Sequence, residues 1–201
     1  MLDITSRSVG SMDNNAYLLR HGGQAVLVDA ADDPAALREL IGDADVTAIV
    51  TTHRHPDHIR ALAALASETG AELIAGAPDA DAIADATGVT IDRRVWDGDE
   101  VFVGPVPFQV IGLVGHTPGS IALAYTPLDG GPTHLFTGDS LFPGGVGRTL
   151  TPKQFESLFH DVTTKLFDQF ADDTVVHPGH GASTTLGHER PNLAEWRARG
   201  W

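Results

Sequence analysis

The segment Thr51–His58 most constrains the fold, because it places three histidines and an aspartate within six positions, directly after an apolar run. Residues 46–50 have the composition of a buried strand. If the chain stays extended beyond them, His53 and His55 lie on the same side, since side chains two positions apart share a face. Neutral imidazole is the commonest metal ligand in proteins, so this pair predicts a metal site.

Asp57 and His58 predict a second ion beside the first. They open a segment whose apolar residues recur at helical spacing, which predicts a helix over residues 58–67. Consecutive residues on a helix point in different directions, so these two side chains are free to serve an ion other than the one bound by His53 and His55.

Three later turns supply further candidate ligands, and each follows an apolar run. His116 follows residues 106–114 in a turn rich in glycine and proline, Asp139 follows residues 134–137, and His180 follows residues 174–176. A carboxylate such as that of Asp139 can bridge two cations. Ligand residues in four turns of this kind form a much stronger signal than any single turn.

Together these motifs resemble the metallo-β-lactamase superfamily in order and spacing over nearly the whole chain. The motifs are His53-x-His55-x-Asp57-His58, Gly115-His116-Thr117-Pro118-Gly119-Ser120, Phe136-Thr137-Gly138-Asp139 and Pro178-Gly179-His180-Gly181. Two runs, 136–142 and 145–149, are most similar to the short bacterial glyoxalase II-like (hydroxyacylglutathione hydrolase-like) branch. The resemblance implies an α/β protein with an αββα four-layer sandwich, and we expect residues 1–201 to form a single domain of this type.

The resemblance also implies how the ligands are divided. One ion is expected on His53, His55 and His116, the other on Asp57, His58 and His180, with Asp139 between them. The expected cofactors are two divalent metal ions, zinc first, with iron or manganese as alternatives. Asp57 is the candidate catalytic residue, because a carboxylate that binds metal can also accept a hydrogen bond from water and orient it.

Such a pair of ions predicts a hydrolase. Two cations lower the pKa of a bridging water and polarise a carbonyl, so a metal-bridging hydroxide can attack a thioester or ester. The expected substrate is therefore a small acyl-thiol or ester. Full-length hydroxyacylglutathione hydrolases carry an additional C-terminal helical domain that helps to hold glutathione, and 201 residues leave no room for it. This argues against recognition of glutathione and leaves the ester of a different low-molecular-weight thiol as an alternative.

Three other interpretations remain open. A persulfide dioxygenase of the same superfamily would bind one iron through His53, His116 and Asp139, a set of two histidines and one carboxylate. A β-lactam or acyl-lactone hydrolase would use the same two ions on another substrate. A non-catalytic metal-binding module is the third alternative.

Composition limits the kinds of molecule that the chain is expected to bind. The formal net charge of −14 should repel phosphate backbones, so no nucleic acid is expected. The sequence contains no cysteine, which excludes thiol catalysis and leaves only histidine and carboxylate as metal ligands. No apolar run approaches membrane-spanning length, and residues 1–7 do not resemble a leader, so we expect no membrane association and a cytoplasmic location. The sequence makes no prediction of oligomeric state.

Local patterns predict alternating strands and helices. The first helix is expected to start with Asp33 as its cap and Pro34 at its first position, and to stop at Gly42. A later helix is expected after Thr151 and Pro152. Further predicted strands cover residues 15–19, 24–29, 46–52, 72–75, 100–103, 106–114 and 121–126, and a further helix covers residues 79–86.

Overall fold

A computed structural model describes residues 2–200, and the first half of the chain forms a six-stranded sheet in the order β1-β2-β3-β4-β5-β6. Its strands are β1 (Asp3–Val9), β2 (Asn14–His21), β3 (Gln24–Val28), β4 (Asp45–Thr51), β5 (Glu72–Gly76) and β6 (Arg93–Val95). Strands β1, β2 and β3 pair antiparallel, whereas β3 to β6 pair parallel. The parallel half needs helical crossovers, which the chain supplies between these strands.

The second half forms another six-stranded sheet in the order β14-β13-β10-β9-β8-β7. Its strands are β7 (Glu100–Val103), β8 (Val106–Gly112), β9 (Ile121–Tyr125), β10 (His134–Gly138), β13 (Val175–Pro178) and β14 (Thr184–Thr185). A two-stranded hairpin of β11 (Leu141–Phe142) and β12 (Gly145–Val146) follows β10. Within the sheet, β10 and β13 pair parallel, so their carboxyl ends meet at one edge.

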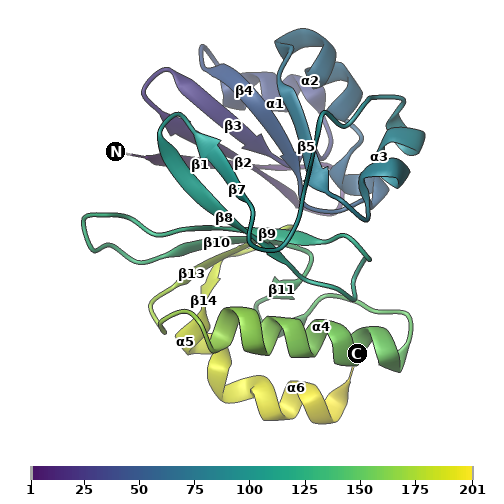
Figure 1. Ribbon diagram of the computed structural model, residues 1–201, viewed down its shortest axis with the longest axis vertical. Helices are drawn as coiled ribbons and strands as arrows, with labels where there is room; N and C mark the ends of the chain where they lie inside the picture. The colour runs from purple at the N-terminus through teal and green to yellow at the C-terminus, as the bar shows by residue number, and fades with distance from the viewer. Residues whose placement is uncertain (1, 201) are drawn as a thin grey trace.

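Helices cover the outer faces of both sheets, as Figure 1 shows. The helices are α1 (Pro34–Ile41), α2 (Leu62–Thr69), α3 (Ala80–Thr87), α4 (Pro152–Asp161), α5 (Leu186–Glu189) and α6 (Leu193–Arg199), and α4 continues into a π-helical turn over Val162–Phe167. Helices α1, α2 and α3 lie over the first sheet, and α4 and α6 lie over the second. The predicted αββα sandwich is therefore confirmed.

Three clusters of buried apolar side chains hold the two sheets and the two helical layers together. The cluster between the two sheets contains side chains from both, such as Val50 of β4 and Phe108 and Phe136 of the second sheet. The two outer clusters lie between each sheet and its helices, with Leu37 and Leu62 in one and Leu158 and Trp196 in the other. Burial on both faces explains why strands such as β4 are apolar runs rather than alternating ones.

Backbone hydrogen bonds join the two sheets at the end where β4, β10 and β13 finish. Ile121 at the start of β9 donates its N–H to the carbonyl of Thr52, just after β4, at 2.9 Å. Asn15 of β2 donates its N–H to the carbonyl of Gly179, just after β13, at 2.7 Å. The loops that carry the candidate ligands are therefore fixed to one another across the sandwich.

The first helix begins and ends where the sequence predicts. Asp33 accepts a hydrogen bond from the N–H of Ala36 at 3.1 Å, Pro34 occupies the first turn, and the chain leaves the helix at Gly42. Asp33 adopts a positive φ of 45°, which aspartate tolerates better than most residues because of its short polar side chain.

The predicted helix over residues 58–67 is wrong in its first turn. Residues Pro56–His58 form a 3-10 turn, and α2 begins only at Leu62. The N–H groups of Arg60 and Ala61 donate to carbonyls of the loop after β3, each at 3.0 Å, instead of to carbonyls within a helix. Docking onto that loop therefore delays α2 and places Asp57 and His58 in the turn before it.

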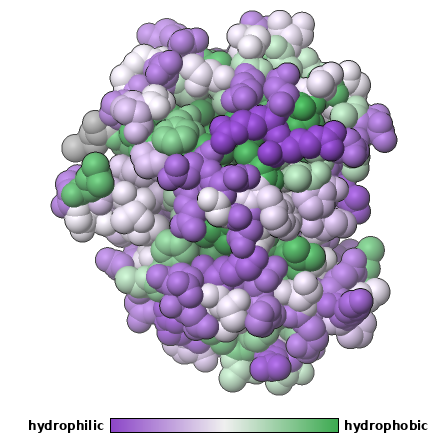
Figure 2. Space-filling model, viewed as in Figure 1, coloured by the Kyte–Doolittle hydropathy of each residue, from purple (hydrophilic) through white to green (hydrophobic). Residues whose placement is uncertain are grey.

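The surface carries the excess of acidic groups. On the face drawn in Figure 2, hydrophilic side chains predominate and apolar side chains appear only as separate small patches. Large apolar side chains that are exposed include Met12, Phe102, Leu128 and Leu150. Within residues 2–200, no helix combines the length and apolar character that crossing a membrane requires.

Candidate metal centre

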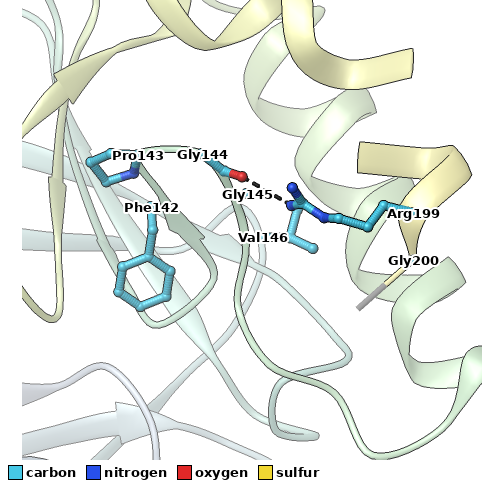
Figure 3. A pocket seen from close by; sticks show the side chains of 7 residues that line it. All are labelled: Phe142, Pro143, Gly144, Gly145, Val146, Arg199 and Gly200. Carbon is cyan, nitrogen blue, oxygen red and sulfur yellow. Dashed lines mark hydrogen bonds between the residues drawn. The ribbon is translucent and has the colours of Figure 1, made fainter. Parts of the chain in front are cut away.

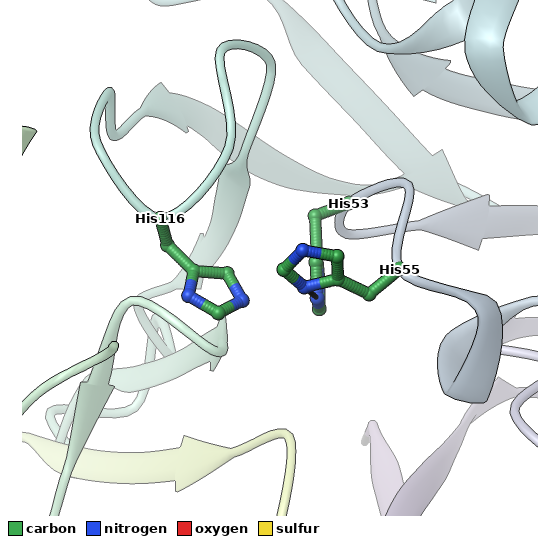
Figure 4. Close-up of side chains that lie close together, drawn as sticks. All are labelled: His53, His55 and His116. Atoms are coloured by element: carbon green, nitrogen blue, oxygen red, sulfur yellow. Dashed lines mark hydrogen bonds between the residues drawn. The ribbon is translucent and has the colours of Figure 1, made fainter. Parts of the chain in front are cut away.

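Three histidine rings from two loops converge beyond the end of β4, as Figure 4 shows. His53 and His55 lie on the loop after β4, and His116 lies on the loop after β8. Nε2 of His53 is 3.1 Å from Nδ1 of His55, and the ring centroid of His116 is 4.8 Å from that of His53 and 4.5 Å from that of His55. One nitrogen of each ring lies within 4.8 Å of the other two, so the three can hold one cation. We call this set the three-histidine group.

A second set combines Asp57 and His58 of the 3-10 turn with His180, which follows β13. Nε2 of His58 is 3.2 Å from Nε2 of His180. Oδ2 of Asp57 is 3.6 Å from Nε2 of His58 and 3.4 Å from Nε2 of His180. Single ligand atoms of the three residues again lie within 4.8 Å of one another. We call this set the aspartate–histidine group.

Asp139 lies between the two groups. Its Oδ2 is 3.3 Å from Nε2 of His180, 3.6 Å from Nε2 of His116 and 4.0 Å from Nε2 of His53. Its Oδ1 is 3.3 Å from Nε2 of His58. The fold thus brings together all the residues that the sequence suggested as ligands, and one carboxylate faces both groups. Their assignment to metal ions remains a prediction.

Burial keeps the three-histidine group neutral. The pKa of His53 is held well below its usual value by burial first and then by the positive charge of His58. Burial likewise lowers the pKa of His55 and of His116. Neutral rings keep a nitrogen lone pair, which is the form that binds metal.

Carboxylates have the opposite effect on the aspartate–histidine group. A hydrogen bond to Asp139 raises the pKa of His180. Burial alone would lower the pKa of His58, but Asp29 and Asp139 outweigh it and raise the pKa to about 10. Burial alone would raise the pKa of Asp139, but His180 and His58 hold it well below its usual range. Asp139 is therefore ionised, and a cation that binds beside it replaces protons.

The donor atoms fit a divalent cation. Nε2 of His116 and Oδ1 of Asp139 are buried and have no hydrogen-bond partner within residues 2–200, although both point into the cluster. Buried polar atoms are rarely left without a partner, so a ligand is expected to satisfy them. Imidazole and carboxylate together suit zinc, iron and manganese.

Asp29, directly after β3, fixes the orientation of the His58 ring through a hydrogen bond to Nδ1. This buried carboxylate accepts hydrogen bonds from the N–H and the hydroxyl of Thr52, each at 2.7 Å, and its Oδ2 lies 2.9 Å from Nδ1 of His58. An ionised carboxylate only accepts, so a neutral His58 carries its proton on Nδ1 and presents Nε2 to the ligand cluster.

Two consecutive asparagines at the start of β2 hold the other side of the cluster. Nδ2 of Asn14 donates to Oδ2 of Asp57 at 2.9 Å. Nδ2 of Asn15 donates to the carbonyls of Pro178 and Gly181, at 3.0 and 2.8 Å, which fixes the loop around His180. Neither residue was predicted from the sequence to support the site. Two consecutive amides directly before the apolar run of β2 could have indicated such a role.

Gly147 passes so close to the cluster that no side chain fits there. A Cβ at this position would overlap the carbonyl oxygen of Asp139 and lie 3.4 Å from Nδ1 of His116.

We expect Gly147→Ala to lower the free energy of unfolding by ~1–3 kcal/mol, the usual cost of overpacking, and to weaken metal binding. Urea denaturation and metal titration check this. Gly23→Ala is the matched control, because nothing lies within 4 Å of its added Cβ and it should unfold like the parent.

Two facing sheets with a histidine and aspartate cluster at one end define a class of metal-binding proteins. The family model described as the metallo-beta-lactamase superfamily matches residues 9–188, and the chain belongs to this superfamily. Members of this fold bind divalent metal ions at such clusters. Curated relatives place the chain in the glyoxalase II-like branch.

Two of these relatives differ in length. The hydroxyacylglutathione hydrolase of Aeromonas salmonicida is 34% identical over 171 residues, which cover 84% of this chain and 61% of that protein. The hydroxyacylglutathione hydrolase GloC of Haemophilus influenzae is 31% identical over 184 residues, covering 83% of this chain and 84% of that protein. The chain therefore spans about three fifths of the first relative and most of the second.

Solved structures agree with the fold. The crystal structure of TTHA1623 in a di-iron-bound form is 33% identical, with a TM-score of 0.73, and the match covers 92% of this chain and 96% of that one. The crystal structure of ETHE1 from Myxococcus xanthus is 28% identical, with a TM-score of 0.82, and the match covers 98% of this chain and 85% of that one.

Proposed function

We propose that this chain is a binuclear metal-dependent hydrolase that cleaves a thioester. The observation that carries the proposal is the pair of ligand groups with Asp139 facing both. The hydroxyacylglutathione hydrolases among its relatives support hydrolysis, and the di-iron form of TTHA1623 supports a site for two ions. Zinc is our first choice, and iron or manganese also suits these ligands.

Two divalent cations at such a site supply an activated water and polarise the carbonyl that it attacks. The chain itself orients the water through Asp57. Burial alone would raise the pKa of Asp57, but the hydrogen bond from Asn14 and the charge of His58 lower it, so its carboxylate stays ionised and able to accept a hydrogen bond. Because Asn14 occupies one side of Oδ2, the carboxylate is held in one orientation toward the cluster.

A pocket on the β11–β12 hairpin, which follows the Asp139 turn, has the size of a small substrate. Its volume is about 360 Å³, near the lower end of the range for small-molecule sites. It is lined by Phe142, Pro143, Gly144, Gly145, Val146, Arg199 and Gly200 (Figure 3). No candidate ligand lines this pocket, but the ring of Phe142 lies 6.2 Å from the ring of His180, so this side chain links the pocket lining to one ligand. This supports an acyl-thiol or ester of low molecular weight.

A mononuclear iron persulfide dioxygenase is the second candidate. Nε2 of His116 and Nε2 of His53 lie 3.6 and 4.0 Å from Oδ2 of Asp139, so two histidines and one carboxylate are close enough to share one iron. This set leaves the aspartate–histidine group without an ion.

Elemental analysis separates the two candidates. We would purify the protein without added metal and count zinc, iron and manganese per chain. About two ions per chain support the hydrolase, whereas a single iron favours the dioxygenase, and oxygen consumption is then measured with a persulfide. Cleavage of acyl-lactones without cleavage of thioesters would keep the metal centre but overturn the substrate class.

Removing the metal is expected to abolish hydrolysis reversibly. In the proposed mechanism the cations lower the pKa of the attacking water, so hydrolysis depends on them. Dialysis against a chelator should therefore reduce thiol release from acyl-thiol substrates to background, and adding back two equivalents of zinc or iron should restore it. Full activity in a protein shown to be metal-free would contradict the proposal.

A further inference from the structure

Asp79 is a fully buried aspartate that contacts both loops of the three-histidine group. Its Oδ2 accepts hydrogen bonds from the hydroxyl of Thr117 at 2.6 Å and from the N–H of Arg54 at 3.1 Å. Its Oδ1 accepts from the N–H of Gly119 at 2.9 Å, and Nε of Arg54 lies 3.7 Å away. Arg54 is the only cation within ion-pair distance of this carboxylate among residues 2–200.

These partners lie within three positions of a ligand in the sequence. Arg54 lies between His53 and His55, and Thr117 follows His116. The loops come from different sheets, one after β4 and the other after β8. One carboxylate therefore fixes the distance between the segments that must meet for three imidazoles to share a cation.

The side chain of Asp79 does not serve the helix that it precedes. Aspartate before a helix ordinarily accepts a hydrogen bond from the first turn. Asp79 stands at the N-cap position of α3, yet its side chain makes no capping hydrogen bond there. Both oxygens point to the ligand loops, so the local explanation for an aspartate at this position does not account for it.

The backbone packs so closely around Asp79 that neither Gly119 nor Gly76 could carry a side chain. A Cβ at Gly119 would lie 2.8 Å from Cβ and Cγ of Asp79, and a Cβ at Gly76 would overlap the carbonyl oxygen of Gly119. The glycine of the Thr-Pro-Gly-Ser motif is thus needed so that the loop after β8 can reach the turn that carries Asp79.

We propose that Asp79 is a positioning residue that sets the metal affinity of the three-histidine group, a proposal that rests on the metal centre proposed above. Removing a side chain that holds metal ligands in position, without itself binding the metal, typically weakens metal affinity ~10- to 100-fold. The aspartate–histidine group is held instead by Asn14, Asp29 and the carbonyl of Met12, and no hydrogen bond of Asp79 reaches it within residues 2–200. The effect should therefore fall on one of the two ions.

The test is zinc titration of the full-length Asp79→Asn variant against a competing chelator. Asparagine keeps the size but puts an NH2 group where one oxygen accepts hydrogen bonds. The dissociation constant that is lost in His116→Ala identifies the three-histidine group. We expect this constant to rise ~10- to 100-fold in Asp79→Asn, and the other to stay within about threefold. Cobalt absorption at the same site should change shape.

The matched control is Asp92→Asn. Oδ2 of Asp92 accepts the N–H of Leu73 in β5 at 2.9 Å, so it also fixes backbone with a carboxylate but touches neither ligand loop. Both constants should match the parent. Affinity is measured on folded protein, so a general loss of stability does not imitate the expected result.

If Asp79→Asn does not fold, Thr117→Val and Thr117→Ser replace it. Valine keeps the shape of threonine without the hydroxyl and should weaken the same site, whereas serine keeps the donor and should retain it. Parent-like affinities at both sites in Asp79→Asn or Thr117→Val would overturn the positioning role. A parent protein that binds only one ion would instead overturn the binuclear centre, and an unchanged affinity for that ion in Asp79→Asn would overturn the role of Asp79 as well.

Discussion

Replacing Asp139 by alanine is expected to abolish hydrolysis and to reduce the bound metal from two ions to one or none. Asp139 is the only carboxylate within 4.0 Å of nitrogens from both groups in residues 2–200. Its loss removes the one carboxylate that faces both groups and leaves, in the described part of the chain, only Asp57 beside both His58 and His180. Losing ion-assisted stabilisation of the transition state costs several kcal/mol, so activity should fall by about a thousandfold or more. Thiol release and elemental analysis check the two effects separately.

Asp139→Asn shows whether charge or shape matters. The low pKa of Asp139 means that its carboxylate is ionised throughout the usual pH range, so the asparagine variant removes a full negative charge at nearly constant size. We expect it to lose metal almost as completely as the alanine variant. His160→Ala, on the exposed face of α4, is the control and should behave like the parent. An Asp139→Ala protein with both ions and full activity would overturn the binuclear assignment.

The ligands themselves could be recognised from the sequence because each follows a signal that is local. His53 and His55 come directly after the apolar run of β4, and His116 and His180 stand in turns marked by glycine and proline. Strand ends and tight turns are set by neighbouring residues, so a histidine placed there is already fixed relative to its own sheet.

The residues that hold the ligands could not be recognised in this way. Asp79 is 25 positions from Arg54 and 38 from Thr117, and Asn14 is 43 positions from Asp57. Each pair meets only when two separate segments dock, and nothing around Asp79 distinguishes it from an ordinary helix cap. The start of α2 was misplaced for the same reason, because the loop after β3 takes the N–H groups of Arg60 and Ala61.

Replacing Asp29 by asparagine is expected to weaken the aspartate–histidine group while leaving the three-histidine group nearly unchanged. The new side chain can still accept the N–H of Thr52, and asparagine tolerates the positive φ of 60° at this position. Its NH2 group, however, would face Nδ1 of His58 and donate to it. The ring would then carry its proton on Nε2, which is the nitrogen that faces Asp57, Asp139 and His180. Zinc affinity of this group should fall ~10- to 100-fold, measured by chelator competition.

The metal-free form of the same variant should lose stability in a pH-dependent way. Asp29 and Asp139 raise the pKa of His58 to about 10 in the folded protein, above the usual value of 6.5, so protonated His58 stabilises the fold. This contribution is complete below pH 6.5 and is lost as pH rises through 10. Urea unfolding of metal-free Asp29→Asn should therefore show the largest loss in free energy of unfolding, relative to the parent, at pH 6 and a smaller loss at pH 10.

Asp33→Asn is the control for this measurement. Asp33 also has a positive φ and asparagine caps a helix equally well, so this variant should match the parent at both pH values. A deficit in Asp29→Asn that does not change with pH, together with parent-like zinc affinity, would show that Asp29 holds only the backbone of Thr52 and leaves the protonation of His58 to its other neighbours.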